Sequence, residues 1–277
     1  MIRAILVATA TAVAFSASVR ADPLPLWELG AGAAVVNLPD YRGSDESRVY
    51  ALPIPYVIYR GEKLKVDRQR VRGLLFSSDL IELDASVSGS VPVRSRDNRA
   101  RAGMPDLDPT LEIGPSANIF LHRGMSGKLT LELRLPLRAV ESLDSRGVEH
   151  QGWLFHPHLN IDIKGVLPGP GWNLGVLAGP LFGSRGYHEY FYGVQPAFAR
   201  ADRPAYEAKG GYSGMQFTTA LSKRFQNYWF GAFFKADSLH NAAFDDSPLV
   251  KRKYSLAGGV AIAWVFAKSS EMVEAKE

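Results

Sequence analysis

The segment from Lys128 to Val140 alternates strictly, and this feature most limits how the chain folds. Its sequence, KLTLELRLPLRAV, has leucine at every second position from 129 to 137, with threonine, proline and charges of both signs between them. Successive side chains of a β-strand point to opposite faces, so the segment predicts a strand with one apolar and one charged face. A helix would instead show apolar residues three and four positions apart.

The same period of two recurs along most of the chain, whereas helical periodicity is nearly absent. Several of the expected strands have ten or more residues. That exceeds the usual length of about 5–6 in globular sheets and matches the roughly 9–11 residues that cross a bilayer when tilted. The expected strands are 26–36, 50–60, 63–76, 79–92, 110–121, 127–140, 153–166, 172–184, 187–195, 212–223, 227–238 and 254–266.

The first 21 residues have the pattern of a secretory signal peptide. Met1 to Arg3 is a short basic start, residues 4–17 are apolar, and Val19-Arg20-Ala21 fits the small-x-small cleavage rule. The apolar run is shorter than the roughly 20 residues of a membrane anchor, so we expect cleavage after Ala21. No later stretch is apolar and long enough for a transmembrane helix. The chain has no cysteine, so no disulfide stabilises it after export.

Composition and motifs give little support to nucleic-acid binding or to serine hydrolase activity. The net charge is +4, or +2 without Arg3 and Arg20, and no basic stripe stands out, so nucleic acid is not expected as a partner. No Gly-x-Ser-x-Gly motif appears, and the serine in the segment 210–214 (GGYSG) reads better as part of a tight loop entering a strand. We therefore predict no catalytic residues and no cofactor.

Three features favour a membrane barrel over a soluble sandwich: the export signal, the long strands, and aromatic residues near strand ends. In a barrel the leucines face lipid, the charges face the interior, and the aromatics form an interfacial girdle, here expected at the periplasmic side. An open edge in lipid would leave backbone groups unpaired, so the sheet must close. The girdle residues are Trp27, Trp153, Tyr228, Trp264 and Phe266.

The predicted fold class is therefore all-β: a closed antiparallel transmembrane β-barrel of the outer-membrane type, with about 12 strands and about 10 or 14 as alternatives. Residues 22–266 form the barrel. The polar segment 267–277 follows the terminal aromatic Phe266 and is expected to be a disordered tail.

Charged and polar residues that alternate with the apolar ones should face the lumen. In an open pore they would set the ion preference, whereas in a closed barrel they would pair and plug the interior. The interior of a barrel of about twelve strands is compatible with either alternative. Two of them, His156 and His158, have the spacing of a metal pair, but a tight site takes three or four ligands, so no metal is predicted. The lumen-facing candidates are Glu132, Arg134, Arg138, His156, His158, Asp162 and Lys164.

The segment 94–110, RSRDNRARAGMPDLDPT, is the most unusual loop. The expected strand order places it, with 141–152, on the periplasmic side, and places 37–49, 196–211 and 239–253 on the outer surface. Periplasmic turns of barrels are normally short, so a long one suggests a docking surface or a plug. The candidate partner-binding residues are Arg94, Arg96, Arg99, Arg101, Asp106 and Asp108.

Four stretches resemble the MipA/OmpV family of Gram-negative outer-membrane proteins: LPDYRGSDE (38–46), DNRARAGMPDLDPTLEIGPS (97–116), GGYSG (210–214) and FDDSPLVKRKYSLAGGVAIAWVF (244–266). The resemblance implies an outer-membrane barrel. One member is described as a scaffold joining a lytic transglycosylase to a murein synthase, and others as porin-like or immunogenic surface proteins.

The resemblance carries over no catalytic residues. We expect a non-enzymatic scaffold that links these murein enzymes to the outer membrane, with outer-membrane lipid around it. A small porin-like channel for polar solutes is the alternative, and the oligomeric state is not predicted.

Overall fold

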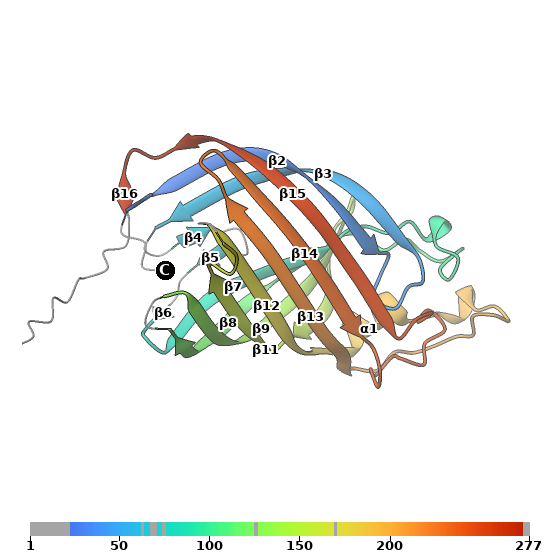
Figure 1. The fold of residues 1–277 in the computed structure, drawn as a ribbon. Helices are drawn as coiled ribbons and strands as arrows, with labels where there is room; N and C mark the ends of the chain where they lie inside the picture. The colour runs from blue at the N-terminus through green and yellow to red at the C-terminus, as the bar shows by residue number, and fades with distance from the viewer. Residues whose placement is uncertain are drawn as a thin grey trace, which may run out of the picture.

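The computed structural model describes residues 23–61, 64–66, 71–73, 76–124, 127–168 and 171–273. The predicted signal peptide, 1–21, and the last residues of the predicted tail lie outside these ranges. One antiparallel sheet dominates the molecule, and its strands follow the order β5-β4-β3-β2-β15-β14-β13-β12-β10-β9-β8-β7-β6, with β11 beside β9 and β12 (Figure 1). Among the described residues no helix has the length and apolar character needed to cross a membrane.

The elements in the first half of the chain are β1 (Leu24–Pro25), β2 (Trp27–Pro39), β3 (Ser47–Arg60), β4 (Leu64–Val66), β5 (Val71–Gly73), β6 (Phe76–Ser77), β7 (Ile81–Ser90), a 3-10 turn (Ser95–Asp97), β8 (Thr110–Arg123) and β9 (Leu129–Asp144). Those in the second half are β10 (Gly147–Phe155), β11 (His158–Lys164), β12 (Trp172–Gly183), α1 (Arg185–Tyr192), a 3-10 turn (Pro196–Phe198), β13 (Gly211–Arg224), β14 (Tyr228–Ser238), β15 (Tyr254–Lys268) and β16 (Met272–Val273).

The sheet returns on itself and forms a barrel. Its two ends, β5 and β6, follow each other in the chain, and both lie beside β7. β10 and β11 also share one position between β9 and β12, where His156 and Pro157 interrupt a single strand. With each of these two pairs taken as one strand, the described residues form a wall of 12 antiparallel strands. The predicted fold class is confirmed.

The strand count was right although two of the predicted strands were wrong. The segment 63–76 is not one strand but a hairpin, because β4 pairs with β5. The segment 187–195 is not a strand, because α1 occupies most of it. The side chain of Ser184 accepts a hydrogen bond from the backbone N–H of Tyr187, which caps the start of that helix. The two errors cancel in number, but every strand between them is predicted in the reverse direction.

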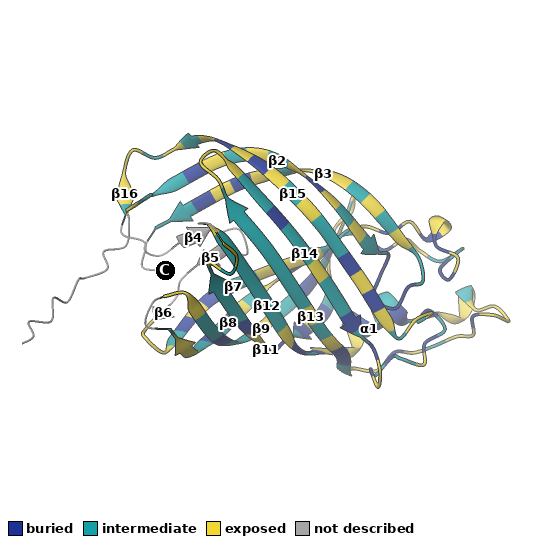
Figure 2. Ribbon diagram, in the orientation of Figure 1, coloured by how far each residue is buried: buried dark blue, intermediate teal, exposed yellow. Residues whose placement is uncertain are grey.

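The leucine face of β9 lies on the outside of the barrel. Leu137 is 42% exposed, whereas Glu132 is 5% exposed on the opposite face. Exposed positions recur along the strands around the barrel (Figure 2). Large apolar residues among them include Val35 on β2, Val87 on β7 and Ile262 on β15. An apolar outer belt with a polar interior is the pattern of a barrel whose solvent is lipid.

The two ends of the barrel differ. We call the end with Trp27 and Lys268 the terminal end; its connections are short turns such as 225–227. The other end, the long-loop end, carries 40–46, 91–109, 184–210 and 239–253 (Figure 1). Outer-membrane barrels have short periplasmic turns and longer outer loops, which assigns the terminal end to the periplasm.

Three placements expected from the sequence are wrong. The loop 94–110 and the segment 141–152 lie at the long-loop end, where Asn98 contacts Asp40 of the loop 40–46. Trp153 also belongs to that end, because its N–H donates to Ser184 Oγ beside α1. All three errors follow from the hairpin at β4 and β5, which adds one reversal of direction. Part of the tail expected to be disordered is β16, which pairs with β1.

Candidate functional site: the barrel interior and its two ends

The long loops pack together into one apolar core at the long-loop end. We call this assembly the cap. Its core residues come from all four long loops, and Leu239, Phe244 and Leu249 among them are fully buried. The phenyl ring of Phe244 stacks on the ring of Tyr192, with centroids 3.7 Å apart. The remaining core members are Tyr41, Val93, Ala100, Leu107, Val194 and Ala242.

The helix α1 connects the cap to the barrel wall. Tyr187 packs against Val140, Leu154 and Leu181, which lie on the inner faces of β9, β10 and β12. This close approach requires glycine on the neighbouring strand. A Cβ at Gly183 would overlap the rings of Tyr187 and His188. The helix therefore sits inside the mouth of the barrel and not above it.

A buried ion pair joins the cap to β14. Arg42 Nε lies 3.2 Å from Asp237 Oδ1, and both side chains are largely shielded from solvent. Arg42 Nη2 also donates to the carbonyl oxygen of Ser213 at 2.8 Å, and Tyr192 donates through its hydroxyl to the carbonyl of Arg42. Such a pair in a low-dielectric setting is costly to break, because removal of one partner leaves a buried charge.

His188 forms a second junction between the cap and the wall. Its Nδ1 is 2.5 Å from the carbonyl oxygen of Lys209, and its Nε2 is 2.5 Å from Ser213 Oγ. A carbonyl only accepts, so Nδ1 carries the proton and the Ser213 hydroxyl donates to Nε2. Burial, with a further contribution from the charge of Arg42, lowers the pKa of His188 and keeps the ring neutral.

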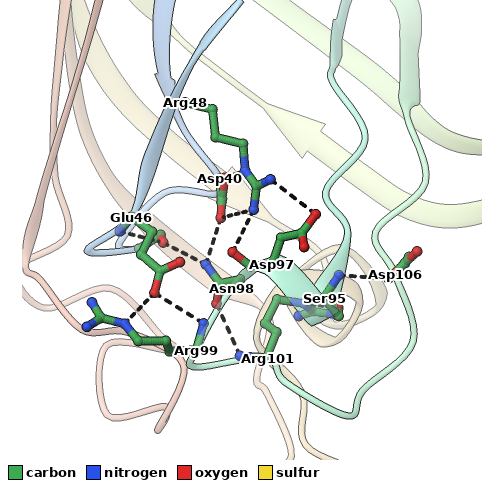
Figure 3. A network of polar contacts seen from close by, with 10 residues as sticks. Asp40, Glu46, Arg48, Ser95, Asp97, Asn98, Arg99, Arg101 and Asp106 are labelled. Carbon is green, nitrogen blue, oxygen red and sulfur yellow. Dashed lines mark hydrogen bonds and ion pairs between the residues drawn. The ribbon is translucent and has the colours of Figure 1, made fainter.

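The loop predicted to bind partners is a structural part of the cap (Figure 3). Arg48 on β3 donates to Asp40 Oδ1 at 2.8 Å and to the carbonyl of Asp97 at 2.7 Å. Asn98 Nδ2 donates to Asp40 Oδ2 at 2.8 Å, and Arg99 Nε donates to Glu46 Oε1 at 2.6 Å. These contacts connect the loop after β7 to the loop between β2 and β3.

The six loop candidates occupy different environments. Arg94, Arg96 and Arg99 are exposed, whereas Arg101 is 3% exposed and donates to the carbonyls of Phe191 and Pro105. Burial lowers the pKa of the Arg101 guanidinium. Asp106 accepts the N–H of Ser95, and the carbonyl of Asp108 accepts the Tyr190 hydroxyl. Burial also raises the pKa of Tyr190 to about 12.

The lumen candidates lie on the inner faces of β9 and of the strand formed by β10 and β11. Several of them are partnered there: Arg134 lies 2.6 Å from Glu132 and 3.6 Å from Asp162, and Arg138 lies 3.0 Å from Glu112. Lys164 continues the same face toward the terminal end. The charges therefore balance one another across neighbouring strands.

The two histidines of the predicted pair are neighbours, with ring centroids 4.5 Å apart. His158 Nδ1 is 2.7 Å from the carbonyl of His156, a contact within the chain. Within the described ranges, no group of three or more His, Asp or Glu side chains has the arrangement of a metal site.

A cavity of about 330 Å³ lies at the terminal end. Glu28 accepts from Arg60 and from Arg224 at 2.7 Å each, so one carboxylate holds two arginines from different strands. Lys268 also lines this cavity, which leaves an excess of positive charge there, and the inner face of β3 supplies Tyr56 and Ile58. We call it the terminal pocket.

The residues that organise both ends are not evident from the sequence. Arg42 and Asp237 are 195 positions apart, and Glu28 and Arg224 are 196 positions apart, so neither pair appears in any local motif. Alternation does place Glu28 and Arg224 on inner faces. It does not indicate which strands become neighbours across the barrel.

The model of the family described as "MltA-interacting protein MipA" matches residues 29–266, which is most of the chain. The chain belongs to the MipA family. The predicted resemblance is thereby confirmed, and the matched region runs from β2 to β15. This MipA-family protein is an outer-membrane β-barrel. A search of curated proteins found no match.

Among solved structures, this MipA-family chain is similar to the COG4313 outer-membrane channel from Pseudomonas putida F1, with 12% identity, a TM-score of 0.46, and coverage of 90% of this chain and 98% of that one. It is also similar to the NanC porin, with 7% identity, a TM-score of 0.39, and coverage of 86% of this chain and 100% of that one.

Proposed function

We propose that this MipA-family barrel is a non-enzymatic anchor that holds a murein lytic transglycosylase and a murein synthase to the outer membrane through its terminal end. The description of the family names an interaction with MltA, and that partner is carried over here as part of the proposal. The small porin-like channel for polar solutes is the competing function.

The observation that supports anchoring most strongly is the cap. Four loops share one apolar core with fully buried side chains, and α1 packs against the inner wall beneath it. An aqueous channel requires a continuous polar path at both ends, and well-packed apolar side chains oppose the passage of polar solutes. The charge pairs on β8, β9 and β11 also favour a filled interior over a conducting one.

The terminal end is the surface available to periplasmic enzymes in this orientation. It carries the terminal pocket and, beside it, the two-stranded pairing of β1 with β16, in which Leu24 lies opposite Val273. The exposed arginines of the loop 94–109 belong to the opposite end, so they are not part of the proposed docking surface. In this proposal β16 and the rim of the terminal pocket bind the enzymes.

Affinity purification from cell envelopes tests the docking surface. We expect the full-length barrel to recover a lytic transglycosylase, and a variant that ends at Lys268, and therefore lacks β16, to recover at least about 10-fold less because a central contact is lost. The control is Arg99→Ala, at the long-loop end, which should recover as much as the unaltered protein. Heat-modifiable migration shows that each barrel is folded. Equal recovery by the truncated barrel contradicts the proposed docking surface.

Planar-bilayer recording separates the anchor from the channel. The unaltered barrel should give no stepwise conductance, because the cap closes the long-loop end. Regular stepwise openings of the unaltered protein favour the solute channel and contradict the anchor as the main function.

A further inference from the structure

The terminal pocket has an apolar inner part and a charged mouth. Tyr56 and Ile58 of β3 line it and are each 5% exposed. The lining residues Phe225, Gln226 and Lys268 are exposed, so solvent reaches the pocket from the terminal end. Its volume, about 330 Å³, falls in the range of small-molecule sites.

Glu28 is the one carboxylate among the described residues that line the pocket, and both of its oxygens are engaged. Oε1 accepts a hydrogen bond from Arg60 and Oε2 accepts one from Arg224, at 2.7 Å each. Lys268 lies opposite Glu28 in the pairing of β15 with β2, but its Nζ donates to the carbonyl oxygen of Gln226. Three cations and one carboxylate give these lining residues a net charge of +2.

This surplus exceeds what the pairing with Glu28 needs. β14 and β15 lie between β13 and β2 in the sheet, so Arg224 reaches across two strands to Glu28. Arg60, on the neighbouring β3, is enough to neutralise that carboxylate. Like charges gathered around one cavity repel each other, so an anion bound among Arg60, Arg224 and Lys268 would lower the free energy of this end.

The composition of the pocket points to a carboxylate with a short apolar body. Guanidinium groups present planar, paired N–H donors that match a carboxylate or a phosphate. The buried side chains of Tyr56 and Ile58 favour an apolar group beside that anion, because hydrocarbon is removed from water there. Inorganic phosphate has no apolar part to place against them.

We propose that the terminal pocket binds a carboxylate that carries a short apolar body. Arg60, Arg224 and Lys268 bind the carboxylate, and Tyr56 and Ile58 contact the body. Such a group reaches this end of the barrel as a free short-chain acid or as the carboxyl end of a peptide. The site does not rest on the anchoring role, because it requires only the pocket.

Isothermal titration calorimetry tests the binding, with the full-length barrel in a nonionic detergent. The probes are acetate, hexanoate and N-acetyl-dialanine, and hexanamide is the uncharged control. We expect saturable binding of hexanoate, at least about 10-fold tighter than that of acetate, because each methylene buried in the pocket adds up to about 4-fold. Hexanamide should not bind. Tighter binding of N-acetyl-dialanine than of hexanoate identifies a peptide end as the natural source, and the reverse order identifies a free acid.

A matched pair of lysine variants tests the site itself. Lys268→Glu lowers the net charge of the lining residues from +2 to 0 and should weaken hexanoate binding at least about 10-fold. Lys251→Glu makes the same change at an exposed position of the long-loop end and should leave binding unchanged. Heat-modifiable migration shows that each variant is folded.

Three results overturn the proposal: no saturable binding of either hexanoate or N-acetyl-dialanine, equal binding of hexanamide, or an equal effect of the two lysine variants. Recovery of a transglycosylase from cell envelopes is measured separately, so failure of the pocket and failure of the anchor are distinguished.

Discussion

The two ends of this barrel are filled differently: apolar side chains pack the long-loop end, whereas the terminal end keeps a cavity. At the long-loop end, apolar side chains from four loops form a core, and the Arg42–Asp237 pair and His188 connect that core to the wall. At the terminal end, short turns leave a cavity in which one carboxylate holds two arginines. The first end behaves like the interior of a soluble domain and the second like a ligand pocket.

This difference shows that barrel closure and barrel filling are separate properties. The wall is fixed by backbone hydrogen bonds between strands, which the membrane makes obligatory. The cap is stabilised by side-chain packing, which can be lost while the wall persists. Perturbations of the cap should therefore change access to the interior without unfolding the barrel.

The largest effect is expected from Phe244→Ala. The phenyl ring is fully buried between Tyr192 and His188, so its removal leaves a cavity and should destabilise the cap by about 4 kcal/mol. Limited proteolysis should then cleave the long loops, while heat-modifiable migration stays normal. Phe234→Ala, on the lipid face of β14, is the matched control and should leave the loops resistant. Loss of the folded barrel in Phe244→Ala would mean that cap and wall are one cooperative unit.

The next effect is expected from Asp237→Ala. It leaves the charge of Arg42 without its carboxylate partner in a buried setting, at a cost of about 3 kcal/mol to the cap. Adding Arg42→Met should recover much of the loss, because the unpaired charge disappears. Asp202→Ala, in an exposed pair with Arg200, should cost less than about 1 kcal/mol. If the double variant is no more stable than the single one, the ion pair is not what joins cap to wall.

A smaller, pH-dependent effect is expected from His188. Burial lowers its pKa in the folded cap, so the unfolded loop binds a proton at higher pH than the folded one. The stabilising contribution is complete above about pH 6.5 and is lost as the pH falls, by at most about 1.4 kcal/mol per pH unit. Protease sensitivity of the cap should rise between neutral pH and pH 5, and His188→Gln should flatten that profile. A profile unchanged in the variant would assign the pH response to other groups.

The smallest effect is expected from Arg99→Ala. Its guanidinium is 80% exposed although it bonds to Glu46, so solvent screens the pair and the cap should lose less stability than in the other variants. Chemical denaturation followed by loop proteolysis measures this difference. A loss as large as that from Asp237→Ala would show that the contact between the loop after β7 and the loop after β2, and not the apolar core, holds the cap.

The fold was predictable because its main constraint is local. Period-two alternation, read along segments such as 127–140, predicted the strands, their outer faces and the inner positions of Glu132 and Arg138. The two incorrect segments fail for identifiable reasons. The stretch 63–76 is long enough for one strand, and the reversal within it depends on pairing with β3. In 187–195 the many aromatic residues favour a strand by composition, but Tyr187 and Phe191 are four positions apart and share one face of a helix, which Ser184 caps and which packs into the mouth.

The sequence by itself determined that the chain is a closed antiparallel barrel with apolar residues toward lipid, because side-chain alternation and backbone pairing are properties of each strand and its neighbours. Only the tertiary structure decided what fills each end. Arg42 meets Asp237, Glu28 meets Arg224, and the loop after β7 meets the loop after β2, because barrel closure brings together segments that the chain separates by dozens to hundreds of residues. Such contacts depend on the direction and stagger of every strand between them. One misplaced hairpin is enough to assign a loop to the wrong end of the barrel.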